Sequence, residues 1–336
     1  MISATNEASW TVVISKGQSR NPHKRDLEQR IAEAAQDLDG VNVLVIPHLY
    51  DLPKSSESFQ KLSTIEGDVV VVSWIFSRAA HWVLDRNGFQ GQFGDVRLGV
   101  DAEPENDPAS TLSENDPDAE PVDRVTDLYP RPNRNIHCID LKVTEDADAF
   151  IHEIRRIVDA PDVKSNGSGN LPIIGGNLVE VQEPASRRWY PFIDFSRCTN
   201  CMECVDFCLF GVYGVDAGEN ILVEQPDNCR KGCPACSRVC PENAIIFPQH
   251  KAPAIAGAQI DGDEGFKIDL SQLFGAPAGG DDPIATAARE RDEQLLLAGR
   301  DAVGIDEQLM KRQADLAKKP KDQLDELLDS LEAFDL

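Results

Sequence analysis

Eight of the nine cysteines of this 336-residue chain lie in one short stretch, between residues 198 and 240. They form two groups of four, with the spacings Cys-x2-Cys-x2-Cys-x3-Cys and Cys-x3-Cys-x2-Cys-x3-Cys-Pro. The first group comprises Cys198, Cys201, Cys204 and Cys208, and the second comprises Cys229, Cys233, Cys236 and Cys240. These spacings are typical of an iron–sulfur module with two clusters, and such a segment folds around the groups that its thiols bind.

The short spacing has a reason in the geometry of a 4Fe–4S cluster, whose four irons each need one thiolate. Cysteines three residues apart in a tight loop reach adjacent corners, while the backbone N–H groups between them point at the sulfides. Four-cysteine zinc sites are the alternative. Zinc ribbons, however, use two Cys-x2-Cys knuckles and need no third cysteine three residues on. A disulfide framework is disfavoured because nothing in the sequence indicates secretion.

The cysteine stretch also repeats internally. Cys201, Cys204 and Cys208 map onto the last three cysteines of the second group at a constant offset of 32 residues. A turn and an apolar run follow each group, at residues 209–215 and 241–247. The repeat predicts two copies of a loop–helix–strand unit around a pseudo-twofold core.

Residues from about 190 to 247 resemble a bacterial-type ferredoxin with two 4Fe–4S clusters. The resemblance rests on the motifs Cys-Thr-Asn-Cys-Met-Glu-Cys-Val-Asp-Phe-Cys and Cys-Pro-Ala-Cys-Ser-Arg-Val-Cys-Pro, and it covers under a fifth of the chain. Two features depart from the family. Leu209 follows Cys208 where Pro is frequent, and one extra residue stands between Cys229 and Cys233.

The resemblance implies how the thiols are shared. In such modules the fourth ligand of each cluster comes from the other cysteine group. One cluster would be held by Cys198, Cys201, Cys204 and Cys240, and the other by Cys208, Cys229, Cys233 and Cys236. We therefore expect two 4Fe–4S clusters whose insertion is coupled to folding.

Composition excludes some other functions. A net charge of −25 and a pI near 4.5 do not fit a generic binder of nucleic acid or acidic membranes. We find no secretory signal, and the longest apolar run, residues 69–76, is too short to span a bilayer. We therefore expect a cytoplasmic protein without a membrane span.

Strand and helix patterns alternate before the cysteines. Strands are expected at residues 10–15, 41–47, 68–75 and 136–143, and helices at 21–38, 56–64, 77–86 and 145–158, the last capped by Thr144. This alternation predicts a small parallel-sheet domain over residues 10–158, a three-layer α/β fold of the flavodoxin or Rossmann type.

The rest of the chain is divided by composition. Residues 101–130 are rich in Asp, Glu and Pro and predict a disordered acidic insertion. We expect a linker at 159–176, the ferredoxin domain at 177–250 with a strand near 177–183 leading into it, and an irregular linker at 251–282. A helical tail at 283–336 would include a helix at 283–297 and an amphipathic helix at 320–336.

The α/β domain offers a weaker candidate site. In open α/β sheets, ligands bind beyond the carboxyl ends of the strands, at the point where the strand order reverses. Ser15, Gly17 and Ser19 follow the first strand, and Trp74 and Ser77 follow the third. A flavin is the candidate ligand, with Trp74 stacking on its ring. No glycine-rich phosphate fingerprint is present, so an ordinary capped turn is the alternative.

Three functions follow from these observations. The first is an electron-transfer protein that passes electrons between redox partner proteins. The second is the iron–sulfur subunit of an oxidoreductase whose α/β domain binds a flavin or a substrate. The third is an adaptor that tethers the ferredoxin module to an enzyme complex, with the C-terminal amphipathic helix as a docking element.

Overall fold

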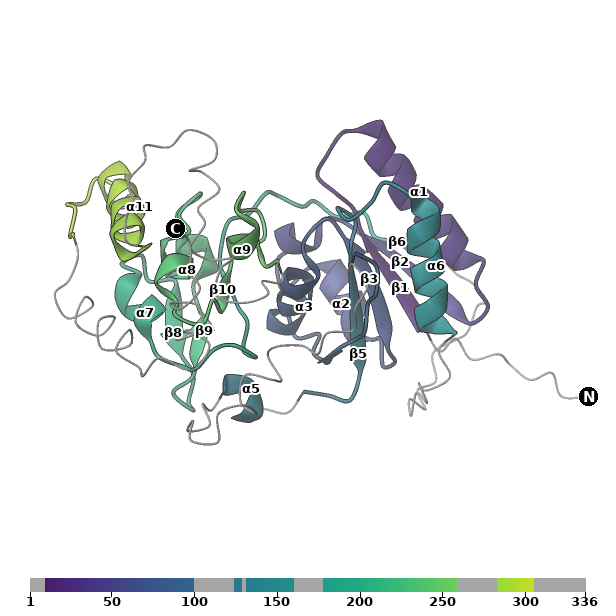
Figure 1. The fold of residues 1–336 in the computed structure, drawn as a ribbon, viewed down its shortest axis with the longest axis horizontal. Helices are drawn as coiled ribbons and strands as arrows, with labels where there is room; N and C mark the ends of the chain where they lie inside the picture. Colours follow the sequence, from purple (N-terminus) through teal and green to yellow (C-terminus); the bar gives the residue numbers. More distant parts are fainter. Residues whose placement is uncertain (1–9, 100–123, 129–130, 160–177, 259–282, 305–336) are drawn as a thin grey trace, which may run out of the picture. The chain divides into compact units, whose positions relative to one another are not determined.

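The computed structural model describes residues 10–99, 124–128, 131–159, 178–258 and 283–304. The chain divides into two compact units, residues 1–278 and 279–336. The first unit contains the α/β domain and the cysteine-rich segment, by which we mean residues 190–258 (Figure 1). In the second unit the structure describes one helix, α11 (Pro283–Leu297), as the sequence predicted. The helix expected at residues 320–336 lies outside the described residues.

The α/β domain is built on a six-stranded, all-parallel sheet. The strand order is β4-β5-β3-β1-β2-β6. The strands are β1 (Trp10–Ser15), β2 (Val41–Ile46), β3 (Val69–Ser73), β4 (Gln92–Phe93), β5 (Asn135–Asp140) and β6 (Leu178–Glu180). The order reverses between β1 and β3, as in flavodoxin-like sheets, which confirms the expected fold class.

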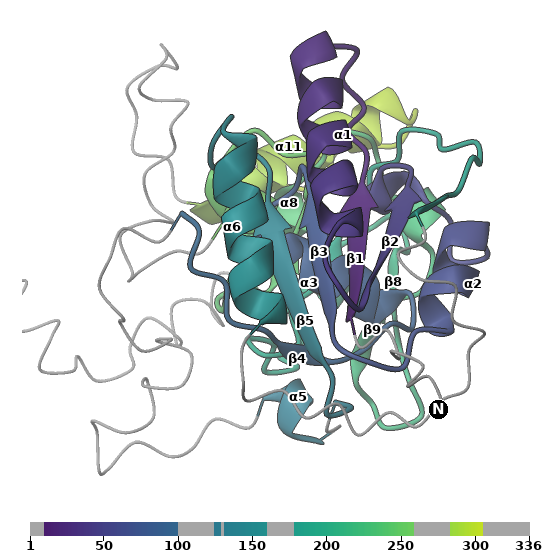
Figure 2. The same ribbon diagram turned by 90° about the vertical axis from the view of Figure 1, so that its right-hand side faces the viewer.

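Helices cover both faces of this sheet. On one face α1 (Pro22–Gln36) and α6 (Ala147–Val158) lie side by side (Figure 2). The other face packs against η1 (Leu49–Asp51), α2 (Glu57–Ser63) and α3 (Ser77–Arg86). Successive residues of β1 alternate between the two cores, so Val12 and Ile14 face α1 whereas Val13 faces α3.

Local sequence explains where these elements form. The valines of β3 are completely buried, as expected for a central parallel strand covered on both faces. Asn21 caps α1 and Pro22 occupies its first turn, where no backbone donor is lost. The expected cap of α6 was wrong by two residues. Asp146 caps that helix, and the Thr144 hydroxyl accepts instead from the Asp146 N–H.

Two segments take places in the fold that differ from the sequence-based expectation. Residues 178–180, expected to lead into the ferredoxin module, pair with β2 as the edge strand of the sheet. The expected acidic insertion, residues 101–130, included residues 125–128, which instead form the short helix α5 (Val125–Leu128). The backbone of α5 bonds the cysteine-rich segment, through Val125 N–H to Cys198 O at 3.0 Å. The remainder of the insertion lies outside the described residues, except for Arg124.

The cysteine-rich segment contains two small antiparallel sheets, β7 with β10 and β8 with β9. Its elements in order are β7 (Phe192–Ile193), α7 (Glu203–Phe207), β8 (Tyr213–Val215), β9 (Ile221–Val223), η2 (Pro226–Asn228), α8 (Ala235–Val239), β10 (Ile245–Ile246) and α9 (Pro253–Ala256). Each cysteine group enters a short helix that a strand follows, and α7 packs against α8. The repeated loop–helix–strand unit is thus confirmed.

The α/β domain and the cysteine-rich segment share a core. Helix α3 packs against the sheet on one side and against β7 on the other. Tyr190, Phe192 and Ile246 of the cysteine-rich segment belong to the same apolar cluster as α2 and α3. The two parts therefore form one compact unit rather than domains joined only by a linker.

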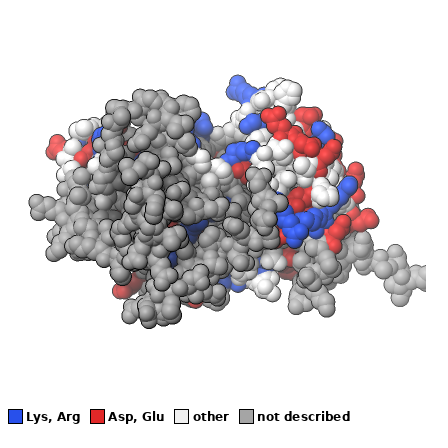
Figure 3. All heavy atoms as spheres, in the orientation of Figure 1, with Lys and Arg blue, Asp and Glu red and all other residues white. Residues whose placement is uncertain are grey.

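The surface shows mixed charge. Over the part of the α/β domain that carries α1 and α6, Figure 3 shows basic and acidic side chains interspersed. Within the described ranges, no helix is both long enough and apolar enough to cross a bilayer.

Candidate metal centre

All eight cysteines of the cysteine-rich segment are free thiols in the structure. Five are buried, Cys208 and Cys229 are partly buried, and Cys201 is exposed. The apolar core of the segment surrounds them, with Val212, Ile221 and Phe247 among its fully buried members. The thiols are therefore collected around an apolar interior and kept largely from water.

The thiols act electrostatically on one another within two sets. Burial and then the thiols of Cys240, Cys201 and Cys198 raise the pKa of Cys204. Burial raises the pKa of Cys240 to about 11, and Cys201 and Cys198 add to this against hydrogen bonds that lower it. These four cysteines constitute the first set.

The second set has the same pattern. Burial and then Cys208, Cys229 and Cys233 raise the pKa of Cys236. Burial and then Cys233 and Cys208 raise the pKa of Cys229. Each set therefore includes one cysteine from the other sequence group, Cys240 in the first set and Cys208 in the second.

The loops next to the cysteines have the backbone geometry of an anion-binding turn. Asn200, Met202 and Asn243 adopt positive φ angles of 58°, 64° and 51°, in the left-handed region that is uncommon for residues other than glycine. Successive N–H groups in such turns form a concave surface suited to negatively charged groups. One such N–H group, that of Ala244, donates a hydrogen bond to Cys240 Sγ at 3.3 Å.

The extra residue between Cys229 and Cys233 is accommodated by a turn. Gly232 has a φ of 87°, and the Cys233 N–H donates to Arg230 O at 3.0 Å. A residue with a side chain would be strained at this φ. The insertion is thus absorbed in the loop, and Cys229 remains within the electrostatic reach of Cys233.

Side chains outside the motif support the second set. The Tyr213 hydroxyl donates to Cys236 Sγ at 3.1 Å, and the Trp189 indole N–H donates to Cys233 O at 3.2 Å. Trp189 also stacks on Phe247, with ring centroids 5.3 Å apart. Sequence reasoning did not assign these contacts, and only the apolar run after Cys208 pointed towards Tyr213.

The donors fit iron–sulfur clusters. Each set offers four sulfur ligands and no oxygen or nitrogen ligand, as the all-cysteine cubane requires. Because burial raises the thiol pKa values, a bound cation is what would keep these sulfurs ionised at neutral pH.

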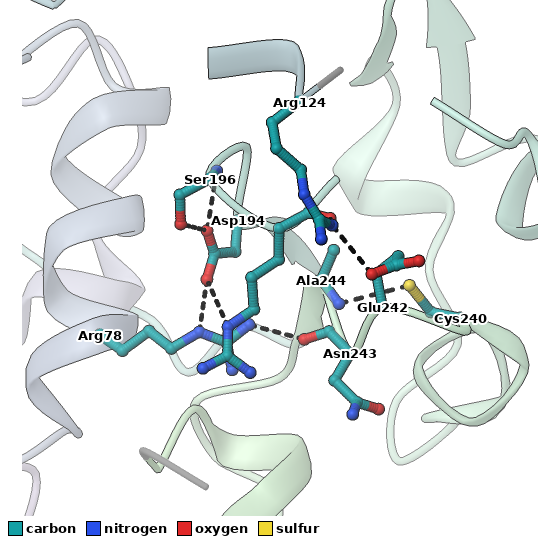
Figure 4. A network of polar contacts seen from close by, with 9 residues as sticks. Arg78, Arg124, Asp194, Ser196, Cys240, Glu242, Asn243 and Ala244 are labelled. Carbon is teal, nitrogen blue, oxygen red and sulfur yellow. Dashed lines mark hydrogen bonds and ion pairs between the residues drawn. The ribbon is translucent and has the colours of Figure 1, made fainter. Parts of the chain in front are cut away.

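A polar network connects the first set to the α/β domain (Figure 4). Arg78 of α3 bonds the Asp194 carboxylate at 2.5 Å and Asn243 O at 2.6 Å. Arg124 bonds the Glu242 carboxylate at 2.8 Å. Sequence reasoning missed these residues, because their partners lie more than 100 positions away and no local motif marks them.

The α/β candidates lie at the carboxyl ends of β1 and β3, except Ser77, which begins α3. Gly17 and Trp74 come together, and both donate to Glu28 Oε1 at 2.7 Å, from the Gly17 N–H and the Trp74 indole N–H. The Ser15 hydroxyl accepts from Leu49 N–H of η1, and the Ser19 hydroxyl accepts from Asn21 N–H at the start of α1. A phosphate here would face the Glu28 carboxylate, which repels it.

A cavity of about 670 Å³ opens beside this point, at the carboxyl ends of β1, β2 and β6. Its lining mixes both charges and includes Lys16, Gln18, His48, Asp51, Glu180 and Arg187. Lys16 and Glu180 form an ion pair at 2.5 Å across it. The sequence did not reveal this cavity, because it depends on β6 joining the sheet.

Comparison with known proteins gives one informative relative. A 66-residue segment of the chain is 50% identical to an uncharacterized ferredoxin of Methanocaldococcus jannaschii. The match covers 19% of this chain and 44% of that protein, so the chain spans less than half the length of this relative. No family model and no solved structure matches the chain. The chain therefore contains a ferredoxin-like segment.

Proposed function

We propose that this protein is an electron-transfer protein with two 4Fe–4S clusters, each held by one of the two cysteine sets. The grouping of the thiols carries the proposal, because each set unites three near neighbours in sequence with one remote cysteine. This arrangement is required by two cubanes that each take their fourth thiolate from the other cysteine group. The first set would hold one cluster through Cys198, Cys201, Cys204 and Cys240. The second would hold the other through Cys208, Cys229, Cys233 and Cys236.

When bound, each cluster takes up and releases one electron, at a potential set by hydrogen bonds, charge and solvent exposure. The protein supplies the surroundings. The apolar core keeps water from most of the sulfurs, and Cys201 is the exposed ligand of the first set. We infer that the first cluster exchanges electrons with a partner protein at the surface where Cys201 is exposed. With a net charge of −25, the chain would be steered towards a basic partner surface.

The flavin alternative is less favoured by the geometry at β1 and β3. The backbone N–H of Gly17, which would bind a flavin phosphate, already donates to a buried carboxylate. The adaptor alternative relied on the amphipathic helix at residues 320–336, which lies outside the described residues. Both alternatives remain compatible with an electron-transferring ferredoxin module.

The first test is the composition of the protein purified without oxygen. Iron and sulfide are quantified on the sample whose visible spectrum is recorded, and released small molecules are identified. We expect broad absorption near ~400 nm and about eight irons per chain, since two cubanes contain four irons each. An iron content near four would contradict the second cluster, and zinc in place of iron would contradict the proposal. A released flavin would revive the oxidoreductase alternative.

The sharing of ligands has its own test. Cys240→Ser should damage the cluster of the first set, although its sequence neighbours Cys233 and Cys236 belong to the second. Cys201→Ser serves as the matched reference, because it removes a ligand that belongs to the first set in any arrangement. The electron paramagnetic resonance signal altered by Cys240→Ser should be the one altered by Cys201→Ser. If it instead matches the signal altered by Cys236→Ser, the proposed sharing is wrong.

A further inference from the structure

Arg78 is a buried cation at the junction of the two parts of the first unit. It lies in the first turn of α3 and is 4% exposed. Its Nε donates to Asp194 Oδ2 at 2.5 Å, and the Asp194 side chain is 2% exposed. A charge removed from water is retained only where close partners offset its lost hydration. The partners of Arg78 in the cysteine-rich segment are therefore essential to its position.

The second partner of Arg78 is a peptide group that also touches a cysteine of the first set. Asn243 O accepts from Arg78 Nη2 at 2.6 Å. The other end of the same peptide group is the Ala244 N–H, which donates to Cys240 Sγ at 3.3 Å. Arg78 and the Cys240 sulfur therefore bind opposite ends of one planar peptide (Figure 4).

This arrangement has an electronic consequence. A cation bonded to the carbonyl oxygen polarises the peptide, which makes its N–H a stronger donor. It also fixes the plane of the peptide. This peptide follows Asn243, whose φ of 51° is uncommon for residues other than glycine. Arg78 thus both orients and strengthens the hydrogen bond that reaches Cys240.

Asp194 connects the same ion pair to a second cysteine of the first set. Its backbone oxygen accepts from Cys198 N–H at 2.9 Å, and its N–H donates to Ala244 O at 2.8 Å. Its carboxylate also accepts from the backbone N–H of Ser196 at 3.0 Å. The ion pair is therefore held against the backbone next to Cys198 and Cys240, both ligands of the same proposed cluster.

We propose that Arg78 of the α/β domain raises the reduction potential of the cluster held by the first set, through the Asn243–Ala244 peptide and its own charge. The proposal rests on the function proposed above. Reduction adds one negative charge to a cluster, so a nearby cation stabilises the reduced form. Hydrogen bonds to the sulfurs act in the same direction. The α/β domain thereby acts as a regulator of the potential and not only as a scaffold.

The test measures the potentials of both clusters in the intact protein by redox titration followed by electron paramagnetic resonance. Arg78→Met should shift the first-set potential downwards and leave the second-set potential unchanged. Asp194→Asn removes the neighbouring negative charge and should shift it upwards. The double variant Arg78→Met/Asp194→Asn should lie between the two single variants. Cys201→Ser identifies which signal belongs to the first set.

The opposite signs separate tuning from simple damage. A purely structural role would make both single variants lose cluster or stability, with no opposed shifts. Arg156→Met is the matched control, because it breaks an ion pair with Glu153 on α6, on the far side of the sheet from α3. It should move neither potential.

Three outcomes would overturn the proposal: an unchanged first-set potential in Arg78→Met, shifts of one sign in both single variants, or equal shifts of both clusters. If Arg78→Met loads no cluster, Arg78→Lys decides the question. Lys keeps the charge without the forked geometry and should give a smaller downward shift, so an unchanged potential would again contradict the proposal. If the unaltered protein contains no clusters, the proposed function itself fails.

Discussion

Replacing Tyr50 with Phe removes one hydroxyl from the contact between the α/β domain and the cysteine-rich segment. Tyr50 lies in η1 and is fully buried. Its hydroxyl donates to Tyr190 O at 2.9 Å and accepts from Tyr190 N–H at 2.7 Å, and the two rings stack with centroids 5.0 Å apart. Burial raises the pKa of Tyr50 well above its ordinary value, so the hydroxyl stays protonated and available as a donor.

The size of the effect follows from the two groups left behind. Tyr190 is 1% exposed, so its backbone N–H and C=O would both be buried without this partner. Each unsatisfied buried group costs about 1–3 kcal/mol, and the carbonyl tolerates the loss better than the N–H. We therefore expect Tyr50→Phe to lower the free energy of unfolding by about 2–4 kcal/mol.

Tyr190→Phe is the matched control. It removes the same hydroxyl from the other ring of the stack, but that hydroxyl makes only a 3.4 Å contact with Tyr50 O. The expected loss is below about 1 kcal/mol, because a long hydrogen bond contributes little.

Both variants would be unfolded with guanidinium without oxygen, while far-ultraviolet circular dichroism and visible absorption are recorded together. In Tyr50→Phe the two transitions should move to lower denaturant by the same amount, since the two parts share a core. A larger effect of Tyr190→Phe would refute the hydrogen-bond reasoning. A shift of only one signal would refute the inference that the parts unfold as one unit.

Two further predictions concern single buried positions. Burial lowers the pKa of His81 to about 4 from 6.5, so its contribution to stability is complete above pH 6.5 and is lost as the pH falls towards 4. Between pH 6.5 and 4, the unaltered protein should lose up to about 3 kcal/mol of unfolding free energy through His81, and His81→Phe should not show this loss. The same pH dependence of the denaturation midpoint in both proteins would contradict this. A Cβ on Gly17 would lie 2.8 Å from Trp74 Cδ1. Gly17→Ala should therefore cost about 1–3 kcal/mol and change the tryptophan fluorescence, whereas an unaltered spectrum would indicate that this loop is open.

Several features could be predicted because their cause is local in the sequence. The buried β3 valines, the alternation of strands and helices, and the start of α3 depend on side chains within one element. The grouping of the cysteines depends on loop lengths, which spacing gives directly. The assignment of one remote cysteine to each cluster followed from the resemblance to two-cluster ferredoxins, in which each cluster takes its fourth ligand from the other cysteine group, and it remains a proposal.

The candidate site in the α/β domain stays a prediction, although the structure brings two of its residues together. Gly17 and Trp74 do meet at the carboxyl ends of β1 and β3, where the strand order reverses. Their meeting point is occupied by Glu28, a residue that the helical pattern of α1 did not distinguish from a solvent-facing acid. Periodicity shows which face a residue lies on, but not which polar group it satisfies there.

The sequence by itself predicted most strands and helices of the α/β domain and the two cysteine groups, and it suggested iron–sulfur clusters as their ligand, since these inferences depend on residues a few positions apart. The tertiary structure alone decided that β6 completes the sheet, that α5 bonds the cysteine-rich segment, and that Arg78 reaches the peptide beside Cys240. In each case the partners are far apart in the chain, and neither partner carries a pattern that specifies the other. Such contacts form only when packing brings buried polar groups together, because each buried polar group then needs a hydrogen-bond partner.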